Sequence, residues 1–192
     1  MGVLAGIFEG YRKSGLPKMR VVWDAAITGI NKRCQYLERV ELPGPEEAIM
    51  IILLFFKMAF SFMCLKIDFS KAYQQVKIRP EDQKYFGVRW KNRWYTRRRM
   101  IEGWCLAGHV WCRLIGSVIR QMKKILAHRY PRFASLIYID DVLLFIPADD
   151  VYVFTGMVFI YLRVLRLPLS YGKTTLGMQV VWVGYLFQFM NW

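Results

Sequence analysis

Apolar and polar positions along the chain alternate between a helical and an extended period. From Ala107 to Ala127 apolar residues recur every three or four positions with Arg and Lys between them, which predicts an amphipathic helix. Residues 151–165 also form a helical pattern. Short apolar or aromatic runs predict strands at residues 19–23, 64–68, 86–90, 93–96, 135–138, 142–146 and 180–189. Mixed elements without an internal repeat predict an α+β fold.

Residues 48–65 form an apolar run, AIMIILLFFKMAFSFMCL, which only Lys57 interrupts. The run is close to the ~20 residues that span a bilayer, although a central Lys costs about 2.5–3.5 kcal/mol there. The alternative is a buried helix that begins after LPGP at residues 42–45, has Glu46 and Glu47 in its first turn, and leads into a strand. The second interpretation is favoured, and no stable membrane partner is expected.

The charge of the 192-residue chain is concentrated in its middle third. The formal net charge is +14, and residues 77–132 hold 15 Lys and Arg but three Asp and Glu. Because Tyr and Trp lie between these cations from Lys84 to Arg99, the segment indicates a polyanion partner such as nucleic acid, although a solvated basic face has the same composition. Four scattered cysteines and an N-terminus without a secretion signal predict an intracellular protein, cytoplasmic or nuclear.

Two adjacent carboxylates interrupt the apolar run LIYIDDVLLF at residues 136–145. A polar turn between two strands would explain Asp140 and Asp141, since uncompensated charges are costly inside a strand. Asp68, however, ends a second apolar run. Three carboxylates from neighbouring strands could instead hold two Mg²⁺ ions roughly 3.5–4 Å apart, the spacing of two-metal phosphoryl transfer.

Several ordered motifs resemble the reverse transcriptases of retroelements, the retroviruses and retrotransposons. LKIDFSKAYQQVKIRPEDQKYFGVRW, residues 65–90, resembles the first palm motif, in which an aromatic follows the metal-binding Asp by five residues. YIDD at residues 138–141 matches the YxDD hairpin, and LPLSYGKTTLGMQVVWVGYLF at residues 167–187 resembles the late palm. KSGLPKMRVVWD, residues 13–24, is similar to the fingers hairpin. The resemblance covers nearly the whole chain.

This resemblance implies an RNA-directed DNA polymerase that transfers a dNTP to a primer 3′-OH on an RNA or DNA template. Asp68 and Asp140 would bridge two Mg²⁺ ions, with Mn²⁺ as a possible substitute. Asp141 would complete the charge, and the backbone carbonyl of Phe69 would be a further metal ligand. These four residues form the catalytic and metal-binding set that the resemblance implies.

The same resemblance implies residues that hold the nucleotide and the primer. Lys13 and Arg20 would bind the triphosphate, Tyr73 would exclude a ribose 2′-hydroxyl, and Lys173 could protonate the leaving group. The nucleotide-binding set also includes Gly103, in a segment MIEGWCLAGHVW that has Ile and Gly where the family usually has prolines, and Glu102 beside the glycine. The primer-grip strand corresponds to Trp182, Gly184 and Tyr185.

The resemblance also predicts the domain organisation. Residues 1–63 would form partial fingers and a connecting helix, and residues 64–192 the palm, with a fingers insertion at about 77–100. Since the sequence ends after the primer-grip strand, a thumb and RNase H would be expected elsewhere, for instance in a neighbouring reading frame, which suggests a retrotransposon-derived fragment. Two alternatives remain: a catalytically inactive nucleic-acid-binding remnant, or a basic membrane-associated protein anchored through residues 48–65.

Overall fold

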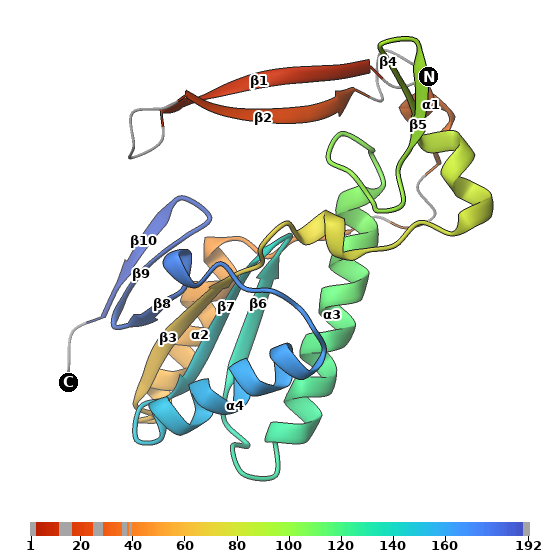
Figure 1. Cartoon of the computed structure of the whole chain (residues 1–192). Coiled ribbons are helices and arrows are strands. Elements are labelled where there is room, and N and C mark those ends of the chain that lie inside the picture. The colour runs from red at the N-terminus through yellow and green to blue at the C-terminus, as the bar shows by residue number, and fades with distance from the viewer. Residues whose placement is uncertain (1–2, 12–16, 25–28, 36–37, 39, 190–192) are drawn as a thin grey trace. The chain divides into compact units, whose positions relative to one another are not determined.

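The computed structural model describes residues 3–11, 17–24, 29–35, 38 and 40–189 (Figure 1). The chain divides into two compact units, each of which combines two stretches of sequence. The first unit contains Met1–Arg39 and Ala72–Val110, and the second contains Val40–Lys71 and Trp111–Trp192. The assignment of fingers to residues 1–63 and palm to residues 64–192 stays a prediction, because compact units are not functional subdomains.

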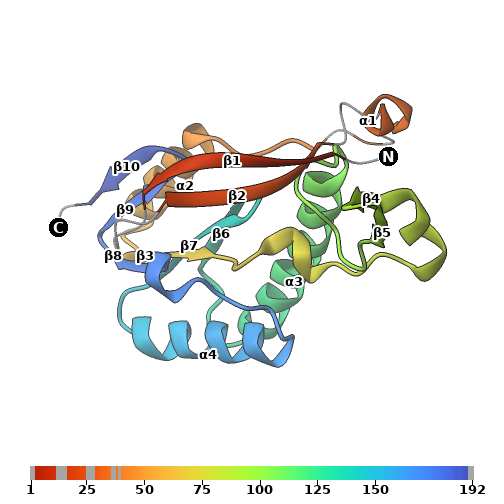
Figure 2. The same cartoon turned by 45° about the horizontal axis from the view of Figure 1, so that its top comes forward.

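The second unit is built on a four-stranded antiparallel sheet with the order β6-β7-β3-β8. Its strands are β3 (Phe62–Asp68), β6 (Ala134–Tyr138), β7 (Asp141–Pro147) and β8 (Thr175–Gly177). Helices α2 (Pro45–Lys57) and α4 (Val151–Val164) lie on opposite faces of the sheet in both views (Figures 1 and 2). The mixed fold confirms the predicted α+β class with helices on an antiparallel sheet.

Helix α3 (Ala107–Leu126) covers the α4 side of this sheet. Its buried positions recur at the predicted helical spacing, and they are Trp111, Ile115, Ile119, Met122 and Leu126. The hydroxyl of Tyr161 in α4 donates a hydrogen bond to the carbonyl of Val118 in α3 at 3.1 Å. This contact joins the two helices side by side over one face.

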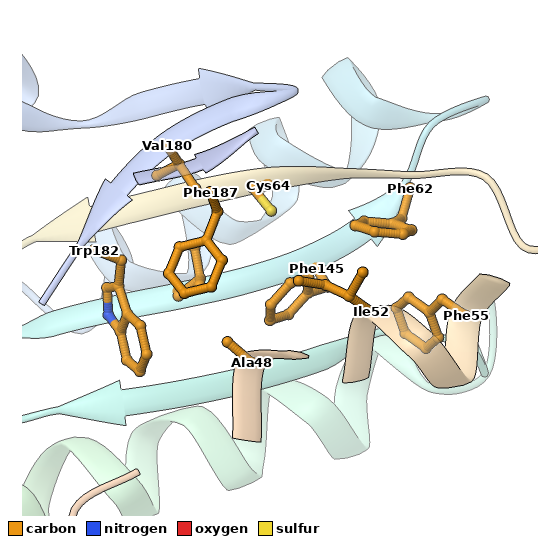
Figure 3. Close-up of a cluster of buried hydrophobic side chains, with 10 residues drawn as sticks. Ala48, Ile52, Phe55, Phe62, Cys64, Phe145, Val180, Trp182 and Phe187 are labelled. Carbon is orange, nitrogen blue, oxygen red and sulfur yellow. The ribbon is translucent and has the colours of Figure 1, made fainter. Parts of the chain in front are cut away.

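The opposite face of the sheet carries a hydrophobic cluster between α2 and a two-stranded hairpin (Figure 3). The hairpin consists of β9 (Gln179–Trp182) and β10 (Tyr185–Gln188). The cluster combines residues from the helix, the sheet and the hairpin, which are Ala48, Ile52, Phe55, Phe62, Cys64, Leu143, Phe145, Val180, Trp182 and Phe187. Complete burial of a side chain such as Phe145 stabilises a fold by about 1.5–3 kcal/mol. The cluster therefore fixes the hairpin to the sheet.

The apolar run at residues 48–65 divides into a helix and a strand. Helix α2 begins at Pro45 and ends at Lys57, and β3 begins at Phe62. The expected start of the helix is confirmed, but its expected burial is wrong for one face, where Met50 and Leu53 are 69% and 61% exposed. Among the helices in the described part of the chain, none is both long and apolar enough to cross a bilayer.

The first unit contains two hairpins and short helices. Its strands are β1 (Val3–Tyr11), β2 (Pro17–Asp24), β4 (Gly87–Trp90) and β5 (Arg93–Thr96). Its helical segments are α1 (Ile30–Arg33) and the 3-10 helices η1 (Ala72–Gln75) and η2 (Pro80–Phe86). The predicted hairpin around residues 91–92 is confirmed, and both turn residues have positive φ. Strand β1 had no counterpart among the sequence-based expectations.

Candidate active site

Two predicted catalytic carboxylates lie opposite each other in the central strands of the sheet. Asp68 is the last residue of β3 and Asp141 is the first residue of β7, and the antiparallel register pairs them directly. Side chains at paired positions lie on the same face, where like charges destabilise the sheet. The Asp68 side chain is 11% exposed and that of Asp141 is 27% exposed. Cations must therefore compensate this pair.

Two lysines provide that compensation. The Lys66 ammonium lies 3.5 Å from a carboxylate oxygen of Asp141, and the Lys173 ammonium lies 3.1 Å from one of Asp68. Lys66 precedes Asp68 by two residues in β3 and so points to the same face. Lys173 ends the 3-10 helix η3 (Tyr171–Lys173). Each carboxylate is thus neutralised by a separate segment of the chain.

Asp140 lies in the two-residue turn between β6 and β7, next to Asp141. Partial burial raises the pKa of the Asp140 carboxyl above its usual value, and the carboxylates of Asp141 and Asp68 raise that pKa further. A backbone hydrogen bond of Asp140 and the charge of Lys173 act in the opposite direction. Asp140 therefore interacts electrostatically with both other carboxylates at this end of the sheet.

The other turn residue, Ile139, has a strained backbone with φ of 51°. The left-handed region is unusual for a β-branched residue and costs on the order of 1–3 kcal/mol. The indole N–H of the fully buried Trp111 donates a hydrogen bond to the Ile139 carbonyl at 3.1 Å. Because Ile139 directly precedes Asp140, this hydrogen bond from α3 helps to position the Asp140 carboxylate.

The segment after Asp68 is bound to a second stretch of backbone. The amide of Ser70 donates to the Pro168 carbonyl at 2.9 Å, and the amide of Ser170 donates to the Asp68 carbonyl at 2.8 Å. The buried ring of Phe69 packs edge-on against Trp111, with 5.5 Å between the ring centroids. The structure thus fixes the backbone around the predicted ligand Phe69.

The predicted primer-grip residues belong to the β9–β10 hairpin. Trp182 is fully buried, and its indole N–H donates to the Asp141 carbonyl at 3.4 Å. The turn consists of Val183 and Gly184, with φ of 50° and 80°, as tight hairpins require. Tyr185 is 54% exposed. Trp182 thus connects the hairpin to β7, while Tyr185 faces solvent.

Other predicted nucleotide-binding residues belong to the first unit. Tyr73 lies in η1, and a β-carbon added at Gly108 would make ordinary contact with its hydroxyl, at 3.9 Å. Gly103 has φ of 97°, and its carbonyl accepts a hydrogen bond from the Asn31 side chain at 3.0 Å. Lys13 lies outside the described residues. Arg20 lies in β2.

The sequence predicted the carboxylates and Lys173 but missed Lys66 and Trp111, which support them. Lys66 was a detectable signal, because a charged residue at an inward position of an apolar strand needs a partner. Trp111 gave no such signal, since its spacing on α3 is that of any core residue. Within the described part of the chain, no three Asp, Glu, His or Cys side chains are grouped closely enough to hold a metal ion.

Comparisons with known proteins identify the family of the chain. The family model described as "Reverse transcriptase (RNA-dependent DNA polymerase)" matches residues 11–187. The chain belongs to this family of reverse transcriptases, which confirms the predicted class of enzyme domain at the level of the family. No curated protein compared with the sequence gave a significant match.

Solved structures of foamy viral protease-reverse transcriptases share the fold. One, in complex with double-stranded DNA, has a TM-score of 0.71 and 13% sequence identity. The matched region covers 97% of this chain and 29% of the foamy viral chain. Another, in complex with an RNA/DNA hybrid, has a TM-score of 0.69 and 14% sequence identity. There the matched region covers 97% of this chain and 22% of the foamy viral chain. The chain thus spans less than a third of either neighbour.

Proposed function

We propose that the chain acts as the polymerase core of an RNA-directed DNA polymerase, which adds deoxynucleotides to a primer 3′-OH opposite an RNA or DNA template. The observation that carries this proposal is the direct pairing of Asp68 with Asp141, with Asp140 in the adjoining turn. The family match over residues 11–187 supports the same reaction. The resemblance to retroelement motifs further supports a retrotransposon origin, and the scattered cysteines and the N-terminus without a secretion signal support an intracellular location.

The donor set at this site fits divalent metal ions of the Mg²⁺ type. Asp68, Asp140 and Asp141 offer only carboxylate oxygens, which hard cations prefer, and Mn²⁺ accepts the same ligands. Burial first, and then the charges of Asp141 and Asp68, raise the pKa of the Asp140 carboxyl, so a bound cation would stabilise its ionised form. Asp68 and Asp140 would hold both ions, with Asp141 and the Phe69 carbonyl as further ligands. Such ions would lower the pKa of the 3′-OH and stabilise the leaving pyrophosphate.

The remaining predicted residues would contact the nucleotide or the primer directly and would not be metal ligands. Lys173 lies beside Asp68, where its ammonium could also donate a proton to a leaving phosphate. Tyr73 is proposed to exclude ribonucleotides by contact with C2′ of the sugar. Lys13, Arg20 and Gly103 are proposed to hold the incoming nucleotide. Tyr185 exposes its ring on the hairpin, which suits a primer contact.

The decisive experiment compares Asp140→Asn with Asp149→Asn in a primer-extension assay with Mg²⁺ on an RNA template. Asp149 is an exposed carboxylate beyond the other end of β7, so its substitution changes the charge equally without touching the site. We expect Asp140→Asn to abolish incorporation and to leave primer-template binding nearly intact, while Asp149→Asn behaves as the unmodified chain.

Two results would contradict the proposal. Incorporation by Asp140→Asn at the rate of the unmodified chain would exclude these carboxylates from catalysis. Template binding by the unmodified chain with no incorporation under any Mg²⁺ or Mn²⁺ condition would support the alternative, a catalytically inactive nucleic-acid-binding remnant.

A further inference from the structure

Helix α2 has a second apolar face on the side opposite the hydrophobic cluster. Ala48, Ile52 and Phe55 point from α2 toward the sheet (Figure 3). On the other side lie apolar side chains that are each at least 48% exposed, namely Ile49, Met50, Leu53 and Leu54. Large contiguous apolar patches on the surface of a protein mark sites of interaction. The outer face of α2 is therefore a candidate interaction surface.

The exposed positions on this face follow a symmetric spacing. The outermost line along the helix consists of Glu46, Met50, Leu53 and Lys57. These positions are separated by four, three and four residues, the intervals that keep side chains on one face of a helix. Ile49 flanks the line on one side and Leu54 flanks it on the other. Because the spacing is the same in both directions, an identical helix in the antiparallel orientation presents the same pattern.

An antiparallel second copy would complement this face position by position. In the register that superposes the two lines, Glu46 of each copy would lie opposite Lys57 of the other, and Met50 of each would lie opposite Leu53 of the other. Opposite charges would meet at both ends of the contact and apolar side chains in its middle. The dipoles of the two helices would also attract in this orientation. A parallel pair would instead bring like charges together.

Charge argues against a lipid surface as the occupant of this face. Helices that lie in the plane of a membrane surface carry Lys and Arg around their apolar face. Helix α2 has Glu46 and Glu47 in its first turn and a single cation, Lys57, in its last turn. Anionic lipids would therefore repel one end of the helix.

Helix α4 also exposes apolar side chains, among them Ile160 and Val164, which are 66% and 73% exposed. It has no acidic residue in its first turn, and its last turn contains Arg163. Two antiparallel copies of α4 would thus gain no ion pair between these turns. The outer face of α2 differs from that of α4 because its charges are complementary to those of a second copy.

We propose that the outer face of α2 binds the same face of a second copy of this chain, which gives a two-fold symmetric dimer with antiparallel α2 helices. Such a contact is isologous, because both copies use the same residues. Two single helices bury less area than the interfaces of obligate dimers, so the association is reversible and depends on concentration. The proposal uses no residue of the candidate active site and does not rest on the proposed function.

Sedimentation velocity of the full chain, freed of nucleic acid, over a series of concentrations tests this dimer. At an ionic strength of about 0.15 M, repulsion between chains of net charge +14 is screened beyond about 8 Å. We expect the average mass to rise from 22.8 kDa toward twice that value. Leu53→Glu places a carboxylate in the middle of the contact and should weaken dimerisation by more than about 100-fold. Ile160→Glu, the matched change on the surface of α4, should leave dimerisation unchanged.

Charge reversal tests the antiparallel register. Glu46→Lys and Lys57→Glu each replace two attractions with two repulsions, so each should weaken dimerisation about 3- to 30-fold. The double variant restores both pairs of opposite charges and should dimerise as the unmodified chain does. Glu47 stays unchanged throughout, because its carboxylate accepts a hydrogen bond from the Gly44 amide at 2.7 Å and caps the helix. Circular dichroism checks that each variant keeps its fold.

Three results would overturn the proposal. They are a monomer at every concentration, a dimer that Leu53→Glu does not weaken, and charge reversals that the double variant does not rescue. Monomers that bind anionic vesicles, and that lose this binding with Leu53→Glu, would identify a membrane as the occupant instead. Because none of these measurements follows nucleotide incorporation, their failure is distinguishable from failure of the polymerase assay.

Discussion

Replacement of Lys66 by Met should destabilise the chain through Asp141. Met preserves the length of the stem but removes an ammonium 3.5 Å from the Asp141 carboxylate. At an effective dielectric constant of about 20, charges at that distance attract by roughly 5 kcal/mol before desolvation is subtracted. Since the side chains are 18% and 27% exposed, we expect a net loss of about 1–3 kcal/mol. For a chain of this size that corresponds to a fall in Tm of about 2–12 °C.

The assay is thermal unfolding followed by circular dichroism in EDTA at low salt. The matched control is Lys124→Met, which removes an exposed lysine and should change stability by less than about 0.5 kcal/mol. A double-mutant cycle with Asp141→Asn isolates the pair, and we expect the double variant to be more stable than the sum of the single effects predicts. Additive effects, or an unchanged Tm for Lys66→Met, would refute the argument that Lys66 compensates Asp141.

Three further substitutions test other contacts. Trp111→Phe removes the hydrogen bond to Ile139 and leaves space in the core, so urea unfolding should show a loss of about 1–3 kcal/mol; an unchanged midpoint would mean that the turn needs no support. Gly184→Ala should cost about 1–2 kcal/mol, because φ is 80° although no atom lies within 4 Å, whereas Gly172→Ala should be neutral or stabilising. Tyr73→Ala should raise ribonucleotide use relative to deoxyribonucleotide use, and an unchanged ratio in single-nucleotide extension would exclude contact with the sugar.

Much of the helical part of the fold could be predicted because the relevant signals are local. Helix α3 has the predicted bounds within one residue, since its apolar stripe and its end before Pro131 are visible in the sequence. The start of α2 was equally predictable from Pro45 and the two glutamates that follow it. The exposure of one face of α2 could not be predicted, because the sequence does not show whether another element covers an apolar side chain.

The strands near the C-terminal end were harder to predict because their turns lack the usual residues. Residues 180–189 were expected to be extended throughout, whereas Val183 and Gly184 form a tight turn between β9 and β10. Valine is not among the residues that indicate a turn, so nothing in the sequence indicated that Val183 would adopt a positive φ. The prediction of two strands around residues 139–141 is confirmed, because the two acidic residues indicated a polar turn even though Ile139 did not.

The strand order of the sheet has a consequence for synthesis on the ribosome. Strand β3 forms its longest ladder with β7, and more than 70 residues separate Asp68 from its partner Asp141 along the chain. At roughly 5–20 residues per second, β3 waits about 4–15 s after its own emergence before β7 is translated. During this interval the FMCLKI segment has an open edge beside the apolar α2, a combination that favours association between nascent chains. The central position of β3 that brings the carboxylates together therefore leaves this apolar strand without its main partner for seconds during synthesis.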